Sequence, residues 1–133
     1  MTTPQPDPKQ FWRMLVSSVQ LLAADYEEQV ATLPDFVHVP DELALNFDDV
    51  WVLVPQIRAA GLLDESAAAQ LEELHQSLGG LADWTLDALR NDPRWATIRE
   101  QARAALAAMH EPRGPIDLSW GSYVAGKPSE QPG

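Results

Sequence analysis

Residues 47–66, FDDVWVLVPQIRAAGLLDES, decide how this chain divides into secondary structure. The consecutive apolar residues at 50–54 have the valine-rich composition of a buried strand. The apolar positions between 50 and 57, however, repeat at the spacing of one helix face. Pro55 removes a backbone hydrogen bond within this repeat. Because no other run offers a partner strand, we predict a buried helix that is bent or broken at Pro55 and ends at Gly61. A strand followed by a helix is the alternative.

The most regular apolar pattern predicts one helix of about 25 residues, from residue 8 to residue 33. Asp7 followed by Pro8 is typical of a helix start, because the aspartate accepts a free backbone N–H and proline suits the first turn. Pro34 ends the helix. Its apolar stripe consists of Trp12, Leu15, Val19, Leu22, Tyr26, Val30 and Leu33.

Two longer helices and one short helix are predicted in the second half of the chain. The first begins after Asp64, the predicted N-cap, and ends at the glycine pair 79–80, which permits a left-handed C-cap. The last begins at the Asp-Pro pair 92–93 and runs to about residue 110. The stretch DWTLDALR, residues 83–90, predicts a short helix between them.

Together these patterns predict an all-α fold, a single-domain helical bundle of four main helices with short connectors. A length of 133 residues suits one domain with one core. We expect a flexible N-terminus at 1–6, the bundle at 7–111, and a Pro/Gly-rich C-terminal tail at 112–133 that is partly docked through 116–124. The prolines at 34 and 40 predict an extended crossover between them.

The charge balance disfavours two classes of partner. The chain has 20 acidic and 9 basic residues, a formal net charge of −11 at pH 7. Nucleic acids and anionic membranes would be repelled, whereas a basic protein would be attracted. No secretory signal is visible, and no run approaches the roughly 18 apolar residues of a transmembrane helix. With no cysteine in the chain, we expect a cytoplasmic protein.

The charges are also segregated along the chain. Residues 25–73 contain twelve acids and one base, Arg58, whereas four arginines lie on or near the last helix. Either the two groups meet inside the fold, or the acidic surface is left for a basic partner. Asp48 and Asp49 are expected at a helix N-terminus, where they would meet the positive end of the dipole.

No motif in the sequence specifies a reaction. Glu72 and His75 have the spacing of two metal ligands on one helix, but di-metal bundles need two such pairs and two further glutamates. Adjacent acids on a helix point about 100° apart, so the pairs Asp48/Asp49 and Glu72/Glu73 do not converge on one substrate atom. We therefore expect no enzyme, no metal site and no cofactor. A metal-dependent bundle enzyme is the alternative that Glu72 and His75 leave open.

Two segments resemble small, acidic, all-helical bacterial proteins, some of which look like immunity proteins encoded beside polymorphic or contact-dependent toxins. The likeness covers less than half of the chain. It is carried by the helix break and restart at 60–64 (AGLLD), the acidic run at 71–74 (LEEL), and the helix opening at 92–99 (DPRWATIR). The resemblance implies tight binding to a toxin and blockage of its active site. Many such toxins are basic nucleases, for which an acidic face would act as a phosphate decoy.

We therefore expect an acidic protein-binding module, and the resemblance implies an immunity-type inhibitor of a basic toxin. Tryptophans in connectors are candidate interface hot spots beside the acidic surface. The predicted partner-binding residues are Asp41, Glu42, Asp48, Asp49, Glu72, Glu73, Trp84 and Trp120. The alternative is a homodimeric scaffold that uses helix 8–33. It requires exposed apolar side chains off the main stripe, for which the candidates are Phe11, Met14, Val16 and Leu21.

Overall fold

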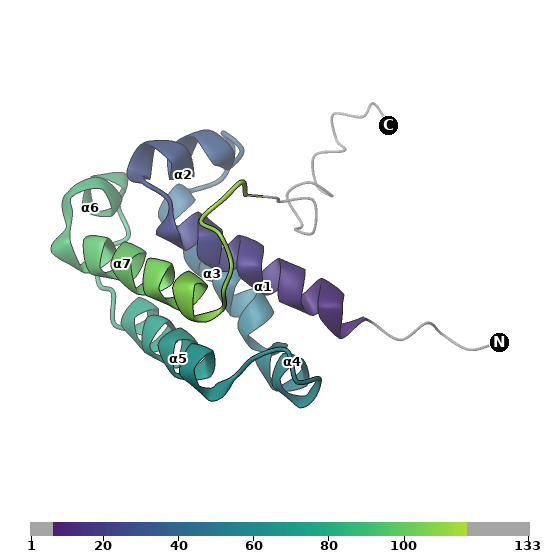
Figure 1. Ribbon diagram of the computed structural model, residues 1–133. Helices are drawn as coiled ribbons and strands as arrows, with labels where there is room; N and C mark the ends of the chain where they lie inside the picture. The colour runs from purple at the N-terminus through teal and green to yellow at the C-terminus, as the bar shows by residue number, and fades with distance from the viewer. Residues whose placement is uncertain (1–6, 117–133) are drawn as a thin grey trace, which may run out of the picture.

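The computed structural model describes residues 7–116, which form seven α-helices and no strand (Figure 1). The helices are α1 Pro8–Ala23, α2 Tyr26–Thr32, α3 Val39–Trp51, α4 Val54–Ala59, α5 Glu65–Gly79, α6 Leu86–Asn91 and α7 Pro93–Ala108. The all-α prediction is confirmed. The count of four main helices is not, although four of the seven have 13 to 16 residues.

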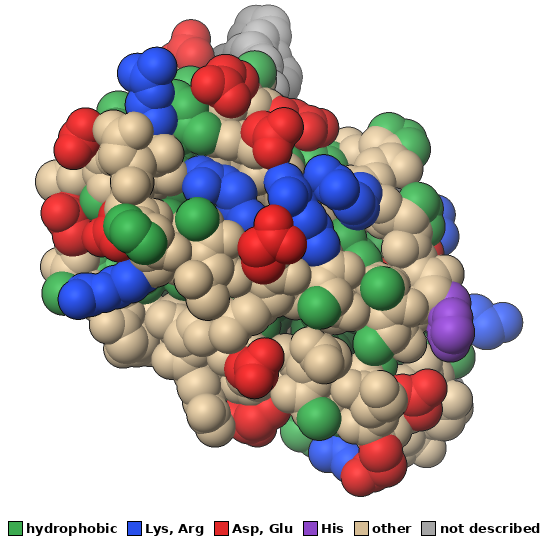
Figure 2. Space-filling model, turned by 60° about the vertical axis from the view of Figure 1, so that its left-hand side comes forward, with side chains coloured by type: hydrophobic (Ala, Val, Ile, Leu, Met, Phe, Trp, Pro, Cys, Tyr) green, Lys and Arg blue, Asp and Glu red, His purple; other side chains and the backbone are tan. Residues whose placement is uncertain are grey.

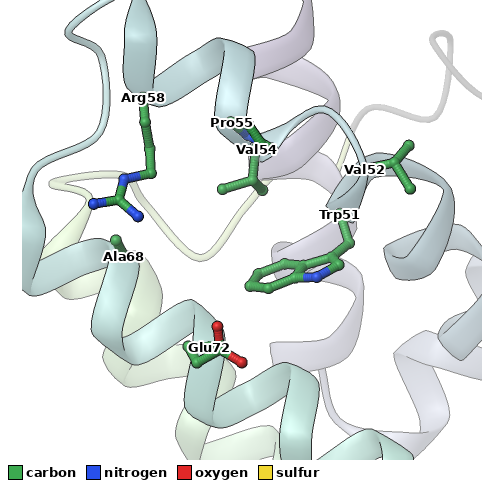
Figure 3. A pocket seen from close by; sticks show the side chains of 7 residues that line it. All are labelled: Trp51, Val52, Val54, Pro55, Arg58, Ala68 and Glu72. Carbon is green, nitrogen blue, oxygen red and sulfur yellow. The ribbon is translucent and has the colours of Figure 1, made fainter.

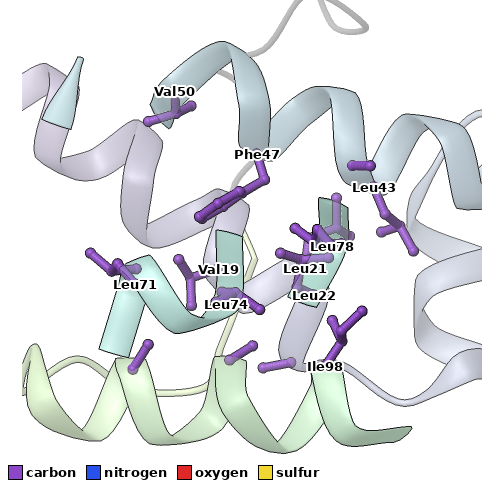
Figure 4. Packing of buried hydrophobic residues seen from close by; sticks show 14 of the residues in the cluster. Val19, Leu21, Leu22, Leu43, Phe47, Val50, Leu71, Leu74, Leu78 and Ile98 are labelled. Atoms are coloured by element: carbon purple, nitrogen blue, oxygen red, sulfur yellow. The ribbon is translucent and has the colours of Figure 1, made fainter. Parts of the chain in front are cut away.

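The helices enclose one apolar core, so the described chain is a single domain. α5 packs on α7, α7 packs on α1, and α1 packs on α3, with α4 against α1 and α6 against α7. Figure 4 shows Phe47 from α3 in the same cluster as Val19 from α1, Leu71 from α5 and Ile98 from α7. Burial of each such side chain contributes about 1.5–3 kcal/mol. α1 is the central element, because every residue from 15 to 24 is buried.

The prediction of one helix from 8 to 33 is wrong. Ala24 and Asp25 take extended backbone conformations, and α2 starts again at Tyr26. The side chain of Arg103 reaches this break, where its Nε donates to the Ala23 carbonyl oxygen at 3.0 Å and its Nη2 contacts Asp25 Oδ1 at 2.9 Å. Val30, placed on the buried stripe by the sequence, is 38% exposed because the break turns α2.

The segment 39–59 forms two helices, which confirms a helix broken near Pro55. The break is at 52–53, and Pro55 lies in the first turn of α4, where its missing N–H has no intrahelical partner to lose. Gly61 follows α4 with a φ of +78°, a conformation that glycine adopts without strain. α3 already begins at Val39, so the expected extended crossover is shorter than predicted.

Two details of the helix ends differ from the predictions. Asp48 and Asp49 lie in the last turn of α3, not at its N-terminus, because the helix starts nine residues earlier, at Val39. Gly80 ends α5 with a φ of −93°, so this C-cap is not left-handed. The N-caps were predicted correctly: Asp64 Oδ1 accepts from the Ala67 N–H, and Asp92 Oδ1 accepts from the Arg94 N–H, at 2.9 and 2.8 Å.

The first residues after α7 return to α1. Gln20 Nε2 donates to the Pro112 carbonyl oxygen at 2.8 Å, and Trp12 Nε1 donates to Glu111 Oε2 at 2.9 Å. Ile116 packs against the core. The predictions for residues 1–6 and for the tail beyond Ile116, including Trp120, fall outside the described residues.

Candidate functional site

The outer face of α3 combines acidic and apolar side chains. Leu43, Phe47 and Val50 point into the core, so the opposite side of the helix faces outward. Two apolar side chains there are exposed: Leu45 by 53% and Val52, just after the helix, by 69%. We call this surface the α3 outer face; it consists of Asp41, Leu45, Asp48, Asp49 and Val52.

The carboxylates of this face have little electrostatic compensation. Among the described residues no Lys or Arg pairs with any of them, and their single ion-pair contact is between Asp48 Oδ1 and His75 Nε2, at 3.8 Å. Asp48 and Asp49 also lie at the negative end of the α3 dipole, which disfavours each by about 0.3–1 kcal/mol. Helix stability therefore does not explain their position.

The pKa of Glu42 is affected by the same accumulation of negative charge. Partial burial raises the pKa of Glu42 above its ordinary value, and repulsion from Asp49 and Asp41 raises it further. Glu42, Asp41 and Asp49 therefore lie close together on α3, and their role in partner binding stays a prediction.

An aromatic cluster joins the end of α3 to α5. The Trp51 and His75 rings stack with 4.3 Å between centroids and 8° between planes. Phe47 lies beside both rings, with centroids 5.8 Å from Trp51 and 6.2 Å from His75. His75 thus has a packing role, and among the described residues no group of three or more His, Asp and Glu side chains is placed to hold a metal.

A cleft of about 350 Å³ opens next to this cluster, between α4 and α5 (Figure 3). The Arg58 guanidinium lies over Ala68 at one end, whereas Trp51 and Glu72 face each other at the other end. Arg58 Nη2 donates to Glu65 Oε1 at 2.6 Å, in an ion pair. The cleft is lined by Trp51, Val52, Val54, Pro55, Arg58, Ala68 and Glu72.

The other predicted residues are not all on the same surface. Glu72 lines the cleft near the α3 outer face, but its neighbour Glu73 lines a separate shallow groove between α5 and α7, with Gln70 and Thr97. Trp84 is partly buried and packs edge-on against Trp95, with 5.7 Å between centroids. A partner-binding role for Glu73 and Trp84 stays a prediction.

Sequence reasoning missed the apolar part of this surface. Leu45 and Val52 are seven residues apart, so they share a helix face with Asp48. The signal was the stripe Leu43, Phe47 and Val50, which assigns Leu45 to the opposite side once the helix is extended back to residue 39. Trp51 and His75 could not be paired from sequence, because nothing local indicates that α3 and α5 meet there.

The arginines of α7 are largely occupied within the fold. Figure 2 shows Lys and Arg side chains gathered in a band on the face that carries α6 and α7. Arg99 Nη2 donates to the Leu89 carbonyl oxygen at 2.6 Å, and Arg103 binds Ala23 and Asp25. The acidic segment and the basic helix therefore meet at Asp25, whereas the described cations leave the α3 outer face unpaired.

The fold and site define a small all-α domain with an acidic, partly apolar helix face. Comparison of the chain with protein-family models, with curated proteins and with solved structures finds no match. The resemblance to immunity proteins stays a prediction. No helix within residues 7–116 combines the length and apolar character that a membrane crossing requires.

Proposed function

We propose that this chain is a non-enzymatic protein-binding module whose α3 outer face recognises a basic protein. The observation that carries the proposal is the position of Asp48 and Asp49 at the negative end of a helix dipole, without a described Lys or Arg partner and beside exposed Leu45 and Val52. Burial is the main cause of the raised pKa of Glu42, and a basic partner would relieve the additional repulsion from Asp49 and Asp41.

The two kinds of side chain contribute differently to binding. Apolar side chains that a partner covers contribute to affinity through the apolar area that they remove from water. Charges at the rim mainly increase the association rate and the salt dependence. We expect Leu45 and Val52 to be the anchors, and Asp41, Asp48 and Asp49 to attract the partner.

The form of this function that the resemblance implies is an immunity-type inhibitor of a basic toxin. The net charge of −11 supports it, because a strongly acidic protein associates quickly with a basic nuclease and competes with its phosphate substrate. The cytoplasm is the expected compartment, since an immunity protein protects the cell that makes it.

The test is a pull-down of tagged protein from an extract of the source cells, at low and at high salt, with captured proteins identified by mass spectrometry. We expect one basic protein, recovered mainly at low salt. The double variant Asp41→Asn/Asp49→Asn should lose it. The control Glu27→Gln/Glu28→Gln removes the same charge from exposed positions on α2 and should retain it. Equal loss in both variants would indicate net charge alone and would overturn the site.

The homodimer alternative stays a prediction, and two of the four side chains proposed for its surface are buried. Val16 is 6% exposed and Leu21 is fully buried, whereas Phe11 and Met14 pack against the core and are only partly buried. Self-association through the α3 outer face is instead an outcome of the test. Recovery of the chain alone at both salt concentrations, with a dimer mass by light scattering, would refute the basic-partner proposal.

A further inference from the structure

We propose that the cleft between α4 and α5 receives one arginine or lysine side chain of the basic partner. This inference deepens the proposed function and rests on it. The cleft is continuous with the α3 outer face, because Val52 belongs to both. A partner that covers Leu45 and Val52 can therefore place a neighbouring side chain at the mouth of the cleft.

The walls of the cleft suit an aliphatic stem. Trp51, Val54, Pro55 and Ala68 provide most of its lining. One face of the Trp51 ring is covered by His75 at 4.3 Å, so the ring is held in place and presents its remaining surface to the cleft. Lys and Arg place their methylene groups along apolar surface while the charged head reaches a polar partner.

The charges of the cleft select a cation and orient it. Arg58 is neutralised by Glu65 at 2.6 Å, so it offers little to an anionic ligand. Glu72, at the opposite end, has one weak contact from Gln76 Nε2, at 3.4 Å. A second carboxylate lies near the same end, because Asp48 Oδ1 is 3.8 Å from Nε2 of His75, which stacks on Trp51. The head group therefore belongs beside Glu72, with the stem pointing toward Val54 and Pro55.

The size of the cleft is sufficient for one long side chain. Its volume of about 350 Å³ is at the lower end of the roughly 300–1,000 Å³ that small-molecule sites occupy. A single long side chain from a partner that is held elsewhere, by the α3 outer face, fits this space.

The test uses the full chain and three blocked amino acids as probes: N-acetyl-arginine methylamide, the norleucine analogue and the glutamate analogue. Titrations are followed by two-dimensional ¹H–¹⁵N NMR, with the Trp51 indole N–H assigned from Trp51→Phe. We expect saturable shifts at Trp51 and at the amides of Val52 and Ala68 with the arginine probe. Glu72→Gln should weaken this binding about fivefold, whereas Glu73→Gln, the same change at the next residue, should not alter it.

Each other outcome contradicts the inference in a different way. Equal binding of the norleucine probe would show an apolar pocket without cation selection. Preferred binding of the glutamate probe would assign recognition to Arg58. If no probe gives a saturable shift at the cleft, the cleft does not bind such side chains and the inference is refuted. The pull-down with the Asp41/Asp49 variant is independent of these results, so the cleft inference can fail while the proposed function stands.

Discussion

Replacement of Gln29 tests why the first apolar stripe forms two helices. Gln29 is fully buried in α2. Its Nε2 donates to the carbonyl oxygens of Leu21 and Leu22, at 3.1 and 3.2 Å, and its Oε1 accepts from Arg99 Nη2 at 3.0 Å. These carbonyl groups belong to the last turn of α1, where a helix leaves its carbonyl oxygens short of backbone N–H partners. The side-chain amide of Gln29 thus supplies hydrogen bonds that the N–H groups of a further helical turn would otherwise supply.

The cost of Gln29→Leu follows from the groups that lose a partner. Leu21 keeps a contact with the Ala24 N–H at 3.4 Å, and Arg99 keeps its bond to the Leu89 carbonyl oxygen. The Leu22 carbonyl and one Arg99 N–H are left without these bonds. At about 1–3 kcal/mol for each of these two unsatisfied groups, we expect a loss of about 2–6 kcal/mol. That loss lowers the Tm by roughly 6–18 °C for a domain of this size.

The measurement is urea unfolding followed by circular dichroism, which gives the midpoint and the slope for each variant. The control is Gln20→Leu, a buried glutamine of α1 that makes one hydrogen bond, to Pro112 at 2.8 Å. It should cost about 1 kcal/mol. If Gln29→Leu costs no more than this control, the hydrogen bonds of Gln29 do not hold the break between α1 and α2.

Further predictions concern single charges. Glu42→Gln should raise the free energy of unfolding by a few tenths of a kcal/mol at neutral pH. Because the pKa of Glu42 is raised in the folded state, the free energy of unfolding of the wild type falls as pH rises through the window just above the ordinary glutamate pKa. Below that window, urea unfolding curves should show a smaller difference between Glu42→Gln and the wild type. Asp49→Asn should stabilise the protein by about 0.3–1 kcal/mol, because it removes charge from the negative end of the α3 dipole; a loss in thermal melts would contradict this. Asp64→Ala should cost about 1 kcal/mol in the same assay through loss of the N-cap, and no change would refute that role.

The sequence alone determined the features that depend on neighbouring residues. The starts of α5 and α7 were predictable because Asp64 and Asp92 accept hydrogen bonds from backbone groups two or three residues away. The broken helix at 52–55 was predictable because proline constrains its own backbone. The all-α class followed from the apolar spacing. For the site, the sequence identified the acidic residues but not which of them share a surface.

Only the tertiary structure decided where the first helix breaks and what the site contains. The break between α1 and α2 is held by Gln29 together with Arg99 and Arg103, which lie more than 70 residues after Ala23 in the chain. No local sequence pattern indicates such long-range contacts. The pairing of Trp51 with His75 likewise requires that α3 and α5 be brought together by a common core. Local hydrogen bonds are encoded within a few residues, whereas the relative position of two helices is the result of packing over the whole chain.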